Sequence, residues 1–366
     1  MQNYNHIAIV GIGLIGGSLA LALKKKGYTG TIVGVDSEEI IQQARERNAV
    51  DKAYIKPDIE NAVKDADLIF LCTPIAEIIK ILQTIGKFVK PSALITDVGS
   101  TKRKIMEIAN IHLPSDVNFI GGHPMAGSEF SSIDAADPFL FENTTWVLTP
   151  GRPLNEEDKR AFGELLEFIG AKVLLLLPNL HDEIAAAVSH LPQMAAVALM
   201  HLAASRQLES PHFLKMAAGG FRDMTRISSS PFGIWTDILQ TNNDMIENYI
   251  DAYITELQTI KKALQDNTIG KYFDRAAQSR LSIPKDTKGF LKPHYDLLVS
   301  VEDRPGMIAD ISKFLAAENI NIKDIEVLKI RENEGGTIRL AFSSESDRDQ
   351  ANHHLSQNGF ECRKRE

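Results

Sequence analysis

The sequence predicts a chain of three parts: an α/β domain with a mostly parallel sheet, an all-α domain and a small α+β domain. Up to about residue 150, apolar β-branched runs alternate with amphipathic segments of helix length. From residue 179 apolar residues recur at helical spacing, and beyond a stretch rich in Pro, Lys and Gly at residues 282–293 strand and helix patterns alternate again. We therefore expect domains at residues 1–178, 179–285 and 294–366.

Six apolar runs in the first domain predict buried strands. They are four to six residues long, rich in β-branched residues, and separated by segments that suit crossover helices. The runs are HIAIVGIG, TIVGVD, DLIFLCTP, SALITDVGS, NFIGGHP and TTWVLTP. AKVLLLL, just before Pro178, predicts a further short strand.

The turn after the first strand carries a GxGxxG motif. Its glycines are Gly11, Gly13 and Gly16, with Leu14 and Ile15 between the last two. Because the motif joins a strand to a helix, it is typical of a Rossmann-type domain in which a pyrophosphate lies at the helix N-terminus. The sequence therefore predicts a dinucleotide site at this turn.

The end of the second strand favours NAD as the dinucleotide. Asp36 stands where an acid binds the adenine ribose hydroxyls and repels a 2′-phosphate, and no Arg directly follows it. The ends of later strands face the same crevice, so we add Thr73, Pro74 and Asp97 to the predicted cofactor site. Each of these three residues could instead serve only in a turn.

The second domain ends in about 35 residues of helical pattern with almost no breaker. One helix of that length exposes more apolar surface than a single domain covers, so we expect it to pair with a second copy of the chain. The third domain reads as strand, helix, strand, strand, helix, strand, which is the βαββαβ order of ferredoxin-like folds.

Composition restricts the class of function. The formal net charge of −8 disfavours a nucleic-acid or anionic-membrane surface. The two cysteines form no disulfide framework or metal motif, and no metal site is expected. The sequence shows neither a signal-peptide pattern nor a long uninterrupted apolar run, so we expect a cytoplasmic protein.

The string GGHPMAGSE at residues 121–129 carries the strongest catalytic signal. His123 follows the strand NFIG and two glycines that allow other groups to approach. An imidazole there can accept a proton from a substrate hydroxyl while hydride leaves the same carbon for NAD. The alternative is a turn histidine bonded to the backbone.

Five motifs, in their order and spacing, closely resemble those of prephenate dehydrogenases and their arogenate-using relatives. They are the GxGxxG turn, DVGSTK, GGHPMAGSE, SHLPQ and GGFRDMTRI, within residues 5–285. The tail is similar to an ACT domain, a regulatory module, through Asp303-Arg304-Pro305-Gly306 between its first strand and helix. The resemblance implies oxidative decarboxylation of prephenate to 4-hydroxyphenylpyruvate, with NAD reduced, in tyrosine biosynthesis.

The resemblance also implies roles for individual residues. His123 accepts the proton of the substrate hydroxyl, and Ser100 contacts that hydroxyl and supports the histidine. Arg226 binds a substrate carboxylate, for which the bidentate geometry of Arg is suited. His190 belongs to a motif near the substrate, in which Gln193 replaces a second histidine of many relatives. The remaining expected pocket residues are Glu129, Asp223 and Trp235.

The third domain is expected to be regulatory. By its resemblance to ACT domains, the turn before its first helix presents backbone NH groups to an amino acid, and two asparagines begin the facing strand. We expect tyrosine, the end product of the pathway, to bind there and inhibit; a purely structural dimerisation module is the alternative. The residues concerned are Asp303, Pro305, Gly306, Met307, Asn319 and Asn321.

Two other functions remain open at this point. The same scaffold could prefer arogenate, in which an amino group replaces the keto oxygen of prephenate. A different class of function is a non-catalytic regulator that senses NAD and amino acids. The joint presence of Ser100, His123 and Arg226 argues against that regulator.

Overall fold

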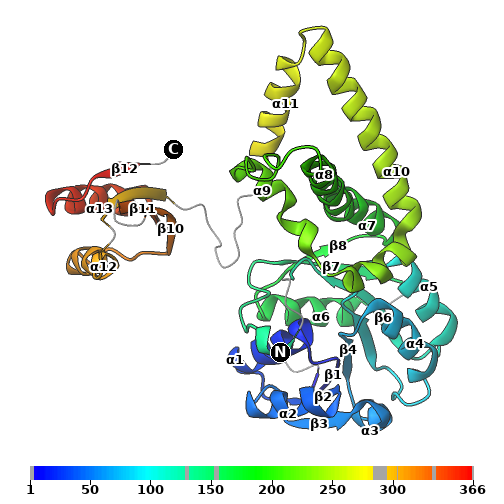
Figure 1. Ribbon diagram of the computed structural model, residues 1–366. Helices are drawn as coiled ribbons and strands as arrows, with labels where there is room; N and C mark the ends of the chain where they lie inside the picture. Colours follow the sequence, from blue (N-terminus) through cyan, green and yellow to red (C-terminus); the bar gives the residue numbers. More distant parts are fainter. Residues whose placement is uncertain are drawn as a thin grey trace. The chain divides into compact units, whose positions relative to one another are not determined.

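The computed structural model describes residues 4–127, 132–151, 156–282, 295–302, 304–331 and 335–364. The chain divides into two compact units, residues 1–282 and 283–366, and each is described by itself (Figure 1). The first unit contains the predicted α/β and helical domains. The second contains the predicted α+β domain.

The first unit is built on an eight-stranded sheet with strand order β3-β2-β1-β4-β5-β6-β7-β8. Neighbouring strands are parallel except β6 and β7, which pair antiparallel, so the predicted mostly parallel sheet is confirmed. The strands are β1 (His6–Val10), β2 (Thr31–Asp36), β3 (Lys52–Ile55), β4 (Leu68–Leu71), β5 (Leu94–Asp97), β6 (Asn118–Pro124), β7 (Thr145–Pro150) and β8 (Lys172–Leu175).

Strand β3 was not predicted from the sequence. It contains only four residues, KAYI, and none of them is buried, because the strand lies at the edge of the sheet. A short exposed strand lacks the apolar run on which the other predictions depend. The further strand predicted within AKVLLLL is present as β8.

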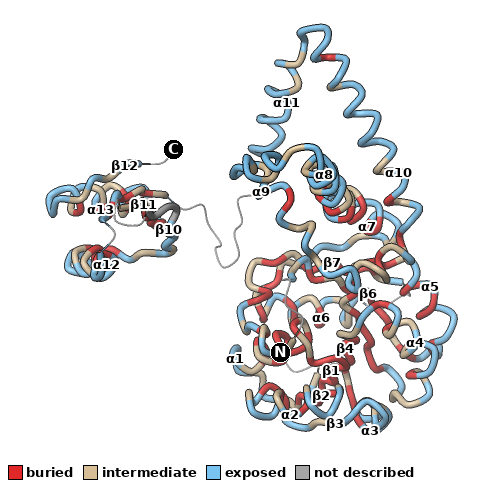
Figure 2. Tube along the Cα trace, viewed as in Figure 1, coloured by how far each residue is buried: buried red, intermediate tan, exposed pale blue. Residues whose placement is uncertain are grey.

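Helices cover both faces of this sheet. They are α1 (Leu14–Lys25), α2 (Glu38–Glu46), α3 (Ile59–Val63), α4 (Ile75–Ile85), α5 (Arg103–His112) and α6 (Glu156–Phe168), with short 3₁₀ turns η1 (Lys56–Asp58) and η2 (Ile133–Ala135). Two buried apolar clusters result, and Figure 2 shows the buried residues concentrated along the strands. One cluster also contains Ala186, Ile238 and Ile246 of the helical domain, so that domain is packed onto the sheet domain through a shared core.

The helical domain contains α7 (Pro178–Ala185), the π-helical segment η3 (Ala186–His190), α8 (Leu191–Gln207), α9 (Gly219–Thr225), the 3₁₀ turn η4 (Arg226–Ser229), α10 (Phe232–Gln265) and α11 (Gly270–Leu281). The long helix predicted from the sequence is α10, but it is not one uninterrupted helix. Asn242 has φ −139° and ψ 22°, which kinks it. Beyond the kink, α10 and α11 project from the domain as a largely exposed hairpin (Figures 1 and 2).

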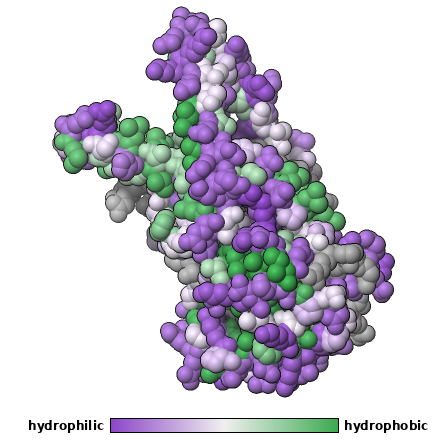
Figure 3. Space-filling model, turned by 90° about the vertical axis from the view of Figure 1, so that its right-hand side faces the viewer, coloured by the Kyte–Doolittle hydropathy of each residue, from purple (hydrophilic) through white to green (hydrophobic). Residues whose placement is uncertain are grey.

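The helical domain leaves many apolar side chains exposed. On the face drawn in Figure 3, hydrophilic residues cover most of the surface and hydrophobic residues form separate patches. The run Pro178–Gln207 has the length and composition of a membrane span, which the sequence analysis did not expect, and only 28% of its most apolar window is buried. A single such helix is weak evidence for a membrane, since an uncovered subunit interface exposes the same kind of surface.

The second unit is a four-stranded antiparallel sheet, of strand order β10-β11-β9-β12, with two helices. Its elements are β9 (Tyr295–Val301), α12 (Met307–Ala317), β10 (Asp324–Arg331), β11 (Gly335–Phe342), α13 (Glu345–Gln357) and β12 (Cys362–Lys364). Apolar residues from the helices and strands form a separate core. The predicted βαββαβ order is confirmed.

Candidate active site

The glycine-rich turn between β1 and α1 has the geometry of a dinucleotide site. Gly11 has φ +95°, and a Cβ atom there would lie 2.6 Å from the carbonyl oxygen of Cys72. A Cβ atom on Gly16 would lie 1.9 Å from the carbonyl oxygen of Gly11, so only glycine fits at both positions. Gly13 is the N-cap of α1, and Leu14 and Ile15 begin that helix. The helix N-terminus can therefore receive a pyrophosphate.

Asp36 and Thr73 lie beside this turn. The Asp36 carboxylate accepts hydrogen bonds of 2.7 Å from the backbone NH groups of Ile12 and Ser37, and Lys56 Nζ lies 3.7 Å from it. The Thr73 hydroxyl is buried without a hydrogen-bond partner in the described residues, next to Gly11. An unsatisfied buried hydroxyl beside a glycine turn fits a polar ligand such as NAD. Pro74, the N-cap of α4, follows on the same side of the sheet.

Asp97, which was also predicted to bind the cofactor, is buried and bonded to protein groups. Its carboxylate forms an ion pair with the buried Lys102 ammonium. It also accepts hydrogen bonds from the backbone NH groups of Gly99 (2.8 Å) and Gly122 (3.2 Å). These bonds join the end of β5 to β6, so Asp97 supports the residue that follows Gly122, which is His123.

His123 lies inside β6 rather than after it, opposite Val147 of β7. The close approach expected at the preceding glycines is found, because a Cβ atom on Gly122 would lie 2.5 Å from the Asp97 carbonyl oxygen. His123 Nδ1 is 2.8 Å from Nε2 of His181, and His181 Nδ1 is 2.8 Å from Asp182 Oδ1. Within the described residues Nε2 of His123 has no hydrogen-bond partner.

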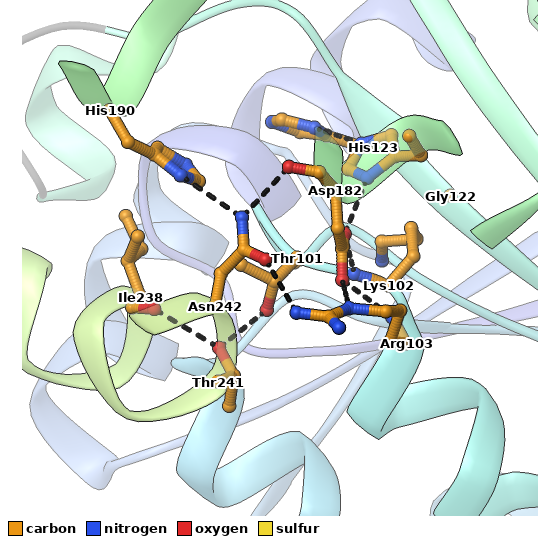
Figure 4. Close-up of polar contacts among 12 residues, drawn as sticks. Thr101, Lys102, Arg103, Gly122, His123, Asp182, His190, Ile238, Thr241 and Asn242 are labelled. Atoms are coloured by element: carbon orange, nitrogen blue, oxygen red, sulfur yellow. Dashed lines mark hydrogen bonds and ion pairs between the residues drawn. The ribbon is translucent and has the colours of Figure 1, made fainter. Parts of the chain in front are cut away.

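Asp182 is the centre of a buried set of polar contacts between the two domains (Figure 4). Its carboxylate accepts hydrogen bonds from the backbone NH groups of Lys102 (2.6 Å) and Arg103 (2.9 Å) and from Arg103 Nε (3.3 Å). Burial opposes ionisation of Asp182, but the bonds from His181, Arg103 and Lys102 outweigh it and lower its pKa. Asp182 is therefore ionised although it is buried, and its hydrogen bonds fix the groups around it.

The kink in α10 brings Asn242 into this set. Its amide nitrogen donates to the backbone carbonyl of Asp182 (2.8 Å) and lies 3.3 Å from His190 Nδ1. Its amide oxygen accepts a hydrogen bond of 2.9 Å from Arg103. The kink thus places one buried amide against both domains. We call Lys102, Arg103, His181, Asp182, His190 and Asn242 the polar cluster.

Both histidines of the predicted site are neutral at pH 7. Burial, with the neighbouring His181, Lys102 and His190, holds the pKa of His123 well below 6.5. Burial lowers the pKa of His190 to about 4, although Asp182 opposes this shift. A neutral imidazole with one free nitrogen can act as a general base.

Comparisons with known proteins agree with this geometry. Residues 19–175 match the family "Prephenate dehydrogenase, nucleotide-binding domain", residues 177–276 match "Prephenate dehydrogenase, dimerization domain", and residues 295–352 match the ACT domain. A prephenate dehydrogenase of Bacillus subtilis (strain 168) is 37% identical over 355 residues, which are 96% of this chain and 95% of that protein. The chain belongs to the prephenate dehydrogenase family.

Solved structures of the family agree with this assignment. Prephenate dehydrogenase from Aquifex aeolicus, solved with hydroxyphenyl propionate and NAD+, has a TM-score of 0.71 and 28% identity, covering 76% of this chain and 98% of that one. Synechocystis arogenate dehydrogenase has a TM-score of 0.68 and 31% identity, covering 76% of this chain and 100% of that one. The predicted fold, NAD cofactor and family are confirmed.

Contacts in the structure place Trp235 beside His190 and Gln193 beside the residue that follows Arg226. The edge of the His190 ring faces Trp235, with 5.9 Å between ring centroids. Gln193 is buried, and its amide nitrogen donates to the backbone carbonyl of Ile227 (3.0 Å). That bond fixes the residue next to Arg226, whose exposed side chain forms no ion pair or hydrogen bond within the described residues.

The other residues expected at the substrate pocket are less well defined by contacts. Ser100 is partly buried in the segment after β5, directly before the polar cluster begins at Lys102. Asp223 is exposed on α9. Glu129 lies outside the described residues. The roles of all three stay predictions.

The predicted regulatory residues lie at the two ends of α12. Gly306, with φ +98°, is the N-cap, and Pro305 and Met307 flank it. Asn319 and Asn321 lie in the turn beyond the helix, because β10 begins only at Asp324 and not at these residues as expected. Asp303 lies outside the described residues. Since α12 has 11 residues and rises about 1.5 Å per residue, one copy of the domain does not bring its two ends together.

Most of the polar cluster was not predicted from the sequence. His181 and Asp182 are adjacent near the start of a helix, a position that normally faces solvent, and Asn242 lies in a helical pattern without a breaker. One signal was available: the pair HD precedes the SHLPQ motif on the same apolar segment. The π-helical segment that ends at His190 is a second mark of a functional position, visible only in the structure.

Proposed function

We propose that this chain catalyses the NAD-dependent oxidative decarboxylation of prephenate to 4-hydroxyphenylpyruvate in tyrosine biosynthesis. The observation that carries the proposal is His123. Its imidazole is neutral, its Nδ1 is bonded to His181, and its Nε2 has no hydrogen-bond partner among the described residues. It lies on a strand of the sheet that carries the dinucleotide turn. This is the arrangement of a base that acts beside a bound nicotinamide.

The reaction follows from these groups. His123 Nε2 accepts the proton of the ring hydroxyl as hydride leaves the same carbon for NAD+. The ring carbon becomes carbonyl-like, the bond to the ring carboxylate breaks, and its electron pair enters the ring. The proton then returns from His123 to the ring oxygen, which becomes the phenol hydroxyl. The products are 4-hydroxyphenylpyruvate, CO2 and NADH, and the gain of aromaticity makes the step irreversible.

Substrate binding is proposed for the residues around His190. Arg226 is exposed and unpaired within the described residues, so its guanidinium can bind a carboxylate in bidentate fashion. Gln193 holds the backbone beside it. Ser100 is proposed to contact the hydroxyl, and Glu129, Asp223 and Trp235 to complete the pocket.

Arogenate is the second candidate substrate. The observation in its favour is the 31% identity to a solved arogenate dehydrogenase. An assay of NADH formation with each substrate, and with NADP in place of NAD, tests both points. We expect prephenate with NAD to give the highest kcat/KM; a higher value with arogenate would reassign the substrate, and no NADH with either would refute the enzyme proposal.

A homodimer is proposed because apolar side chains on the helical domain are exposed. Examples are Leu202 (59%), Phe273 (73%) and Leu281 (75%). The matched family is described as a dimerization domain, and a second copy would cover such a surface. Light scattering should give twice the mass of one chain; the mass of one chain would contradict the proposal. We place the enzyme in the cytoplasm, which suits its free thiols Cys72 and Cys362.

Tyrosine is proposed to bind the ACT domain and inhibit. Because Gly306 and Asn319 lie at opposite ends of α12, a site that uses both turns needs two copies of the domain. Tyrosine should inhibit the full chain, and Gly306→Val should weaken that inhibition while the uninhibited rate is kept. Inhibition that is unchanged in Gly306→Val and purely competitive with prephenate would place tyrosine in the active site instead.

A further inference from the structure

Behind His123 lies a second histidine to which the reaction above gives no task. His181 is 2% exposed and Asp182 is fully buried. The two histidine rings meet edge to face, with 5.0 Å between centroids and 66° between planes, and Nε2 of His181 is 2.8 Å from Nδ1 of His123. With the 2.8 Å contact between His181 Nδ1 and Asp182, three side chains form one hydrogen-bonded line that ends at Nε2 of His123.

The positions of the protons along this line follow from its inner end. The ionised Asp182 carboxylate can only accept hydrogen bonds, so Nδ1 of His181 must carry a proton. When His181 carries only this one proton, its Nε2 is a lone pair that accepts from His123, so Nδ1 of His123 carries a proton. Nε2 of His123 is therefore unprotonated, which is the state required of a base.

Neighbouring groups keep Asp182, at the inner end of this line, in its ionised form. The Asp182 carboxylate accepts hydrogen bonds from the backbone NH groups of Lys102 and Arg103, and these NH groups remain donors at every pH. The titratable groups near the two imidazoles are Lys102, which is paired with Asp97, and the neutral His190 on η3. Arg103 pairs with Asp182 and, on its exposed side, with Asp244. The carboxylate next to His181 is thus the nearest stabiliser for a positive charge in the line.

Resting on the proposed function, we propose that His181 and Asp182 are positioning residues that form a proton relay behind His123. As the O–H bond of the substrate breaks, a bond forms between that proton and Nε2 of His123. The Nδ1–H bond of His123 then breaks and the proton bonds to Nε2 of His181. The positive charge rests on His181 beside Asp182, and bound NAD+ would accept the hydride. After CO2 has left, the proton returns along the same line to the phenolate oxygen of the product.

A merely structural role for His181, as a residue that holds α7 against β6, predicts something different. Loss of packing would lower thermal stability and would affect NAD and substrate affinity as well as turnover. The relay predicts a loss in kcat with KM nearly unchanged, because the proton shift belongs to the transition state. It also predicts that the nature of the replacing side chain matters.

Two substitutions of His181 separate its two proposed functions, which are to accept the hydrogen bond that fixes the tautomer of His123 and to receive the proton from His123. In His181→Gln the amide oxygen can still accept from His123 Nδ1, so the tautomer is kept but no proton can be received. In His181→Leu both functions are lost. We expect kcat to fall about 10-fold for Gln and about 10²- to 10³-fold for Leu, with KM for prephenate and NAD within about 3-fold of the unsubstituted enzyme.

Asp182→Asn tests the tautomer argument from the other end. The amide group has one acceptor oxygen instead of two, so its NH2 group faces a backbone NH in either orientation. With the NH2 group at the Oδ1 position it also donates to His181 Nδ1, which reverses both imidazoles and leaves a proton on Nε2 of His123. We expect a loss in kcat on the order of 10³-fold or more, as in other sites where an acid fixes a catalytic histidine. NAD titration and thermal unfolding of each variant identify the folded proteins on which the comparison is made.

The outcomes distinguish the relay from the proposed function. Absence of prephenate oxidation by the unsubstituted enzyme would refute the function. An active enzyme whose His181→Leu variant binds NAD normally and keeps kcat within about 3-fold would refute the relay alone. Equal losses for Gln and Leu that appear in KM would also refute it, and would make His181 a packing residue. If Leu does not fold, a Gln variant with unchanged kcat and pH profile refutes the relay.

Discussion

The dinucleotide turn and the polar cluster are built in opposite ways. The turn is contiguous in sequence, and backbone geometry sets it: Gly11 needs a positive φ and Gly16 admits no Cβ atom. The polar cluster draws Lys102 and Arg103 from the sheet domain and His181, His190 and Asn242 from the helical domain. The glycine turn is thus local to one motif, whereas His123, the proposed base, is positioned by tertiary contacts between two domains.

Because of this difference, we expect substitutions in the two regions to affect different properties of the protein. A change in the turn should abolish NAD binding and leave the polar cluster folded. A change in the cluster should reduce turnover or stability and leave NAD affinity as it was. Each prediction below tests one side of that separation.

The largest of these effects is expected at the turn. Gly16→Ala places a Cβ atom 1.9 Å from the Gly11 carbonyl oxygen, so the turn must shift away from the pyrophosphate position. We expect NAD affinity to fall by about 100-fold or more, because several hydrogen bonds to a charged group are lost. Gly163→Ala in α6, where a Cβ atom meets nothing within 4 Å, is the matched control and should bind NAD normally. Equal affinities in a calorimetric titration would contradict the role of the turn.

The cluster should make the protein sensitive to acid. The pKa of His190 is about 4 in the folded chain and 6.5 in a free histidine, so the unfolded chain binds protons first as pH falls. The contribution of His190 to the free energy of unfolding is therefore fully present above pH 6.5 and is lost as the pH falls from 6.5 to 4. The loss is on the order of 3 kcal/mol. Urea unfolding at several pH values measures the loss. His190→Gln should reduce that slope, and an unchanged slope would show that other groups are responsible.

A smaller effect is expected for a residue outside both regions. Arg226→Ala removes the proposed carboxylate ligand, and we expect KM for prephenate to rise about 10- to 100-fold with little change in kcat or in NAD affinity. Arg206→Ala on α8, whose side chain pairs only with Glu209 in the described residues, is the control. A KM that stays constant in Arg226→Ala would remove this arginine from the substrate site.

The smallest effect concerns the choice between NAD and NADP. Asp36→Ser removes the carboxylate that would repel a 2′-phosphate. It also releases Lys56, whose ammonium lies 3.7 Å from the Asp36 carboxylate, so that Lys56 can approach the 2′-phosphate of NADP. We expect NAD affinity to fall about 10-fold and NADP affinity to rise by a similar factor. If NADP binding is unchanged in steady-state assays, the NAD preference does not depend on Asp36.

The same contrast explains which features of the fold and the site could be predicted from the sequence. The strands, the dinucleotide turn and His123 follow from local patterns, and the structure contains them. Strand β3 was missed because an exposed edge strand has no apolar run, and the kink at Asn242 was missed because bonds to Asp182 and Arg103 stabilise it. His181 meets His123 only when α7 packs against β6, a tertiary contact that the pair HD before SHLPQ does not by itself predict.

The most direct test of the account is the reaction of NAD-saturated enzyme with prephenate, followed by NADH absorbance, in the unsubstituted chain and in His123→Asn. We expect one NADH and one CO2 for each prephenate consumed by the unsubstituted chain. In His123→Asn we expect kcat to fall by about 10³-fold while NAD affinity and KM stay nearly unchanged. Near-normal turnover in His123→Asn would contradict the assignment of His123 as the base.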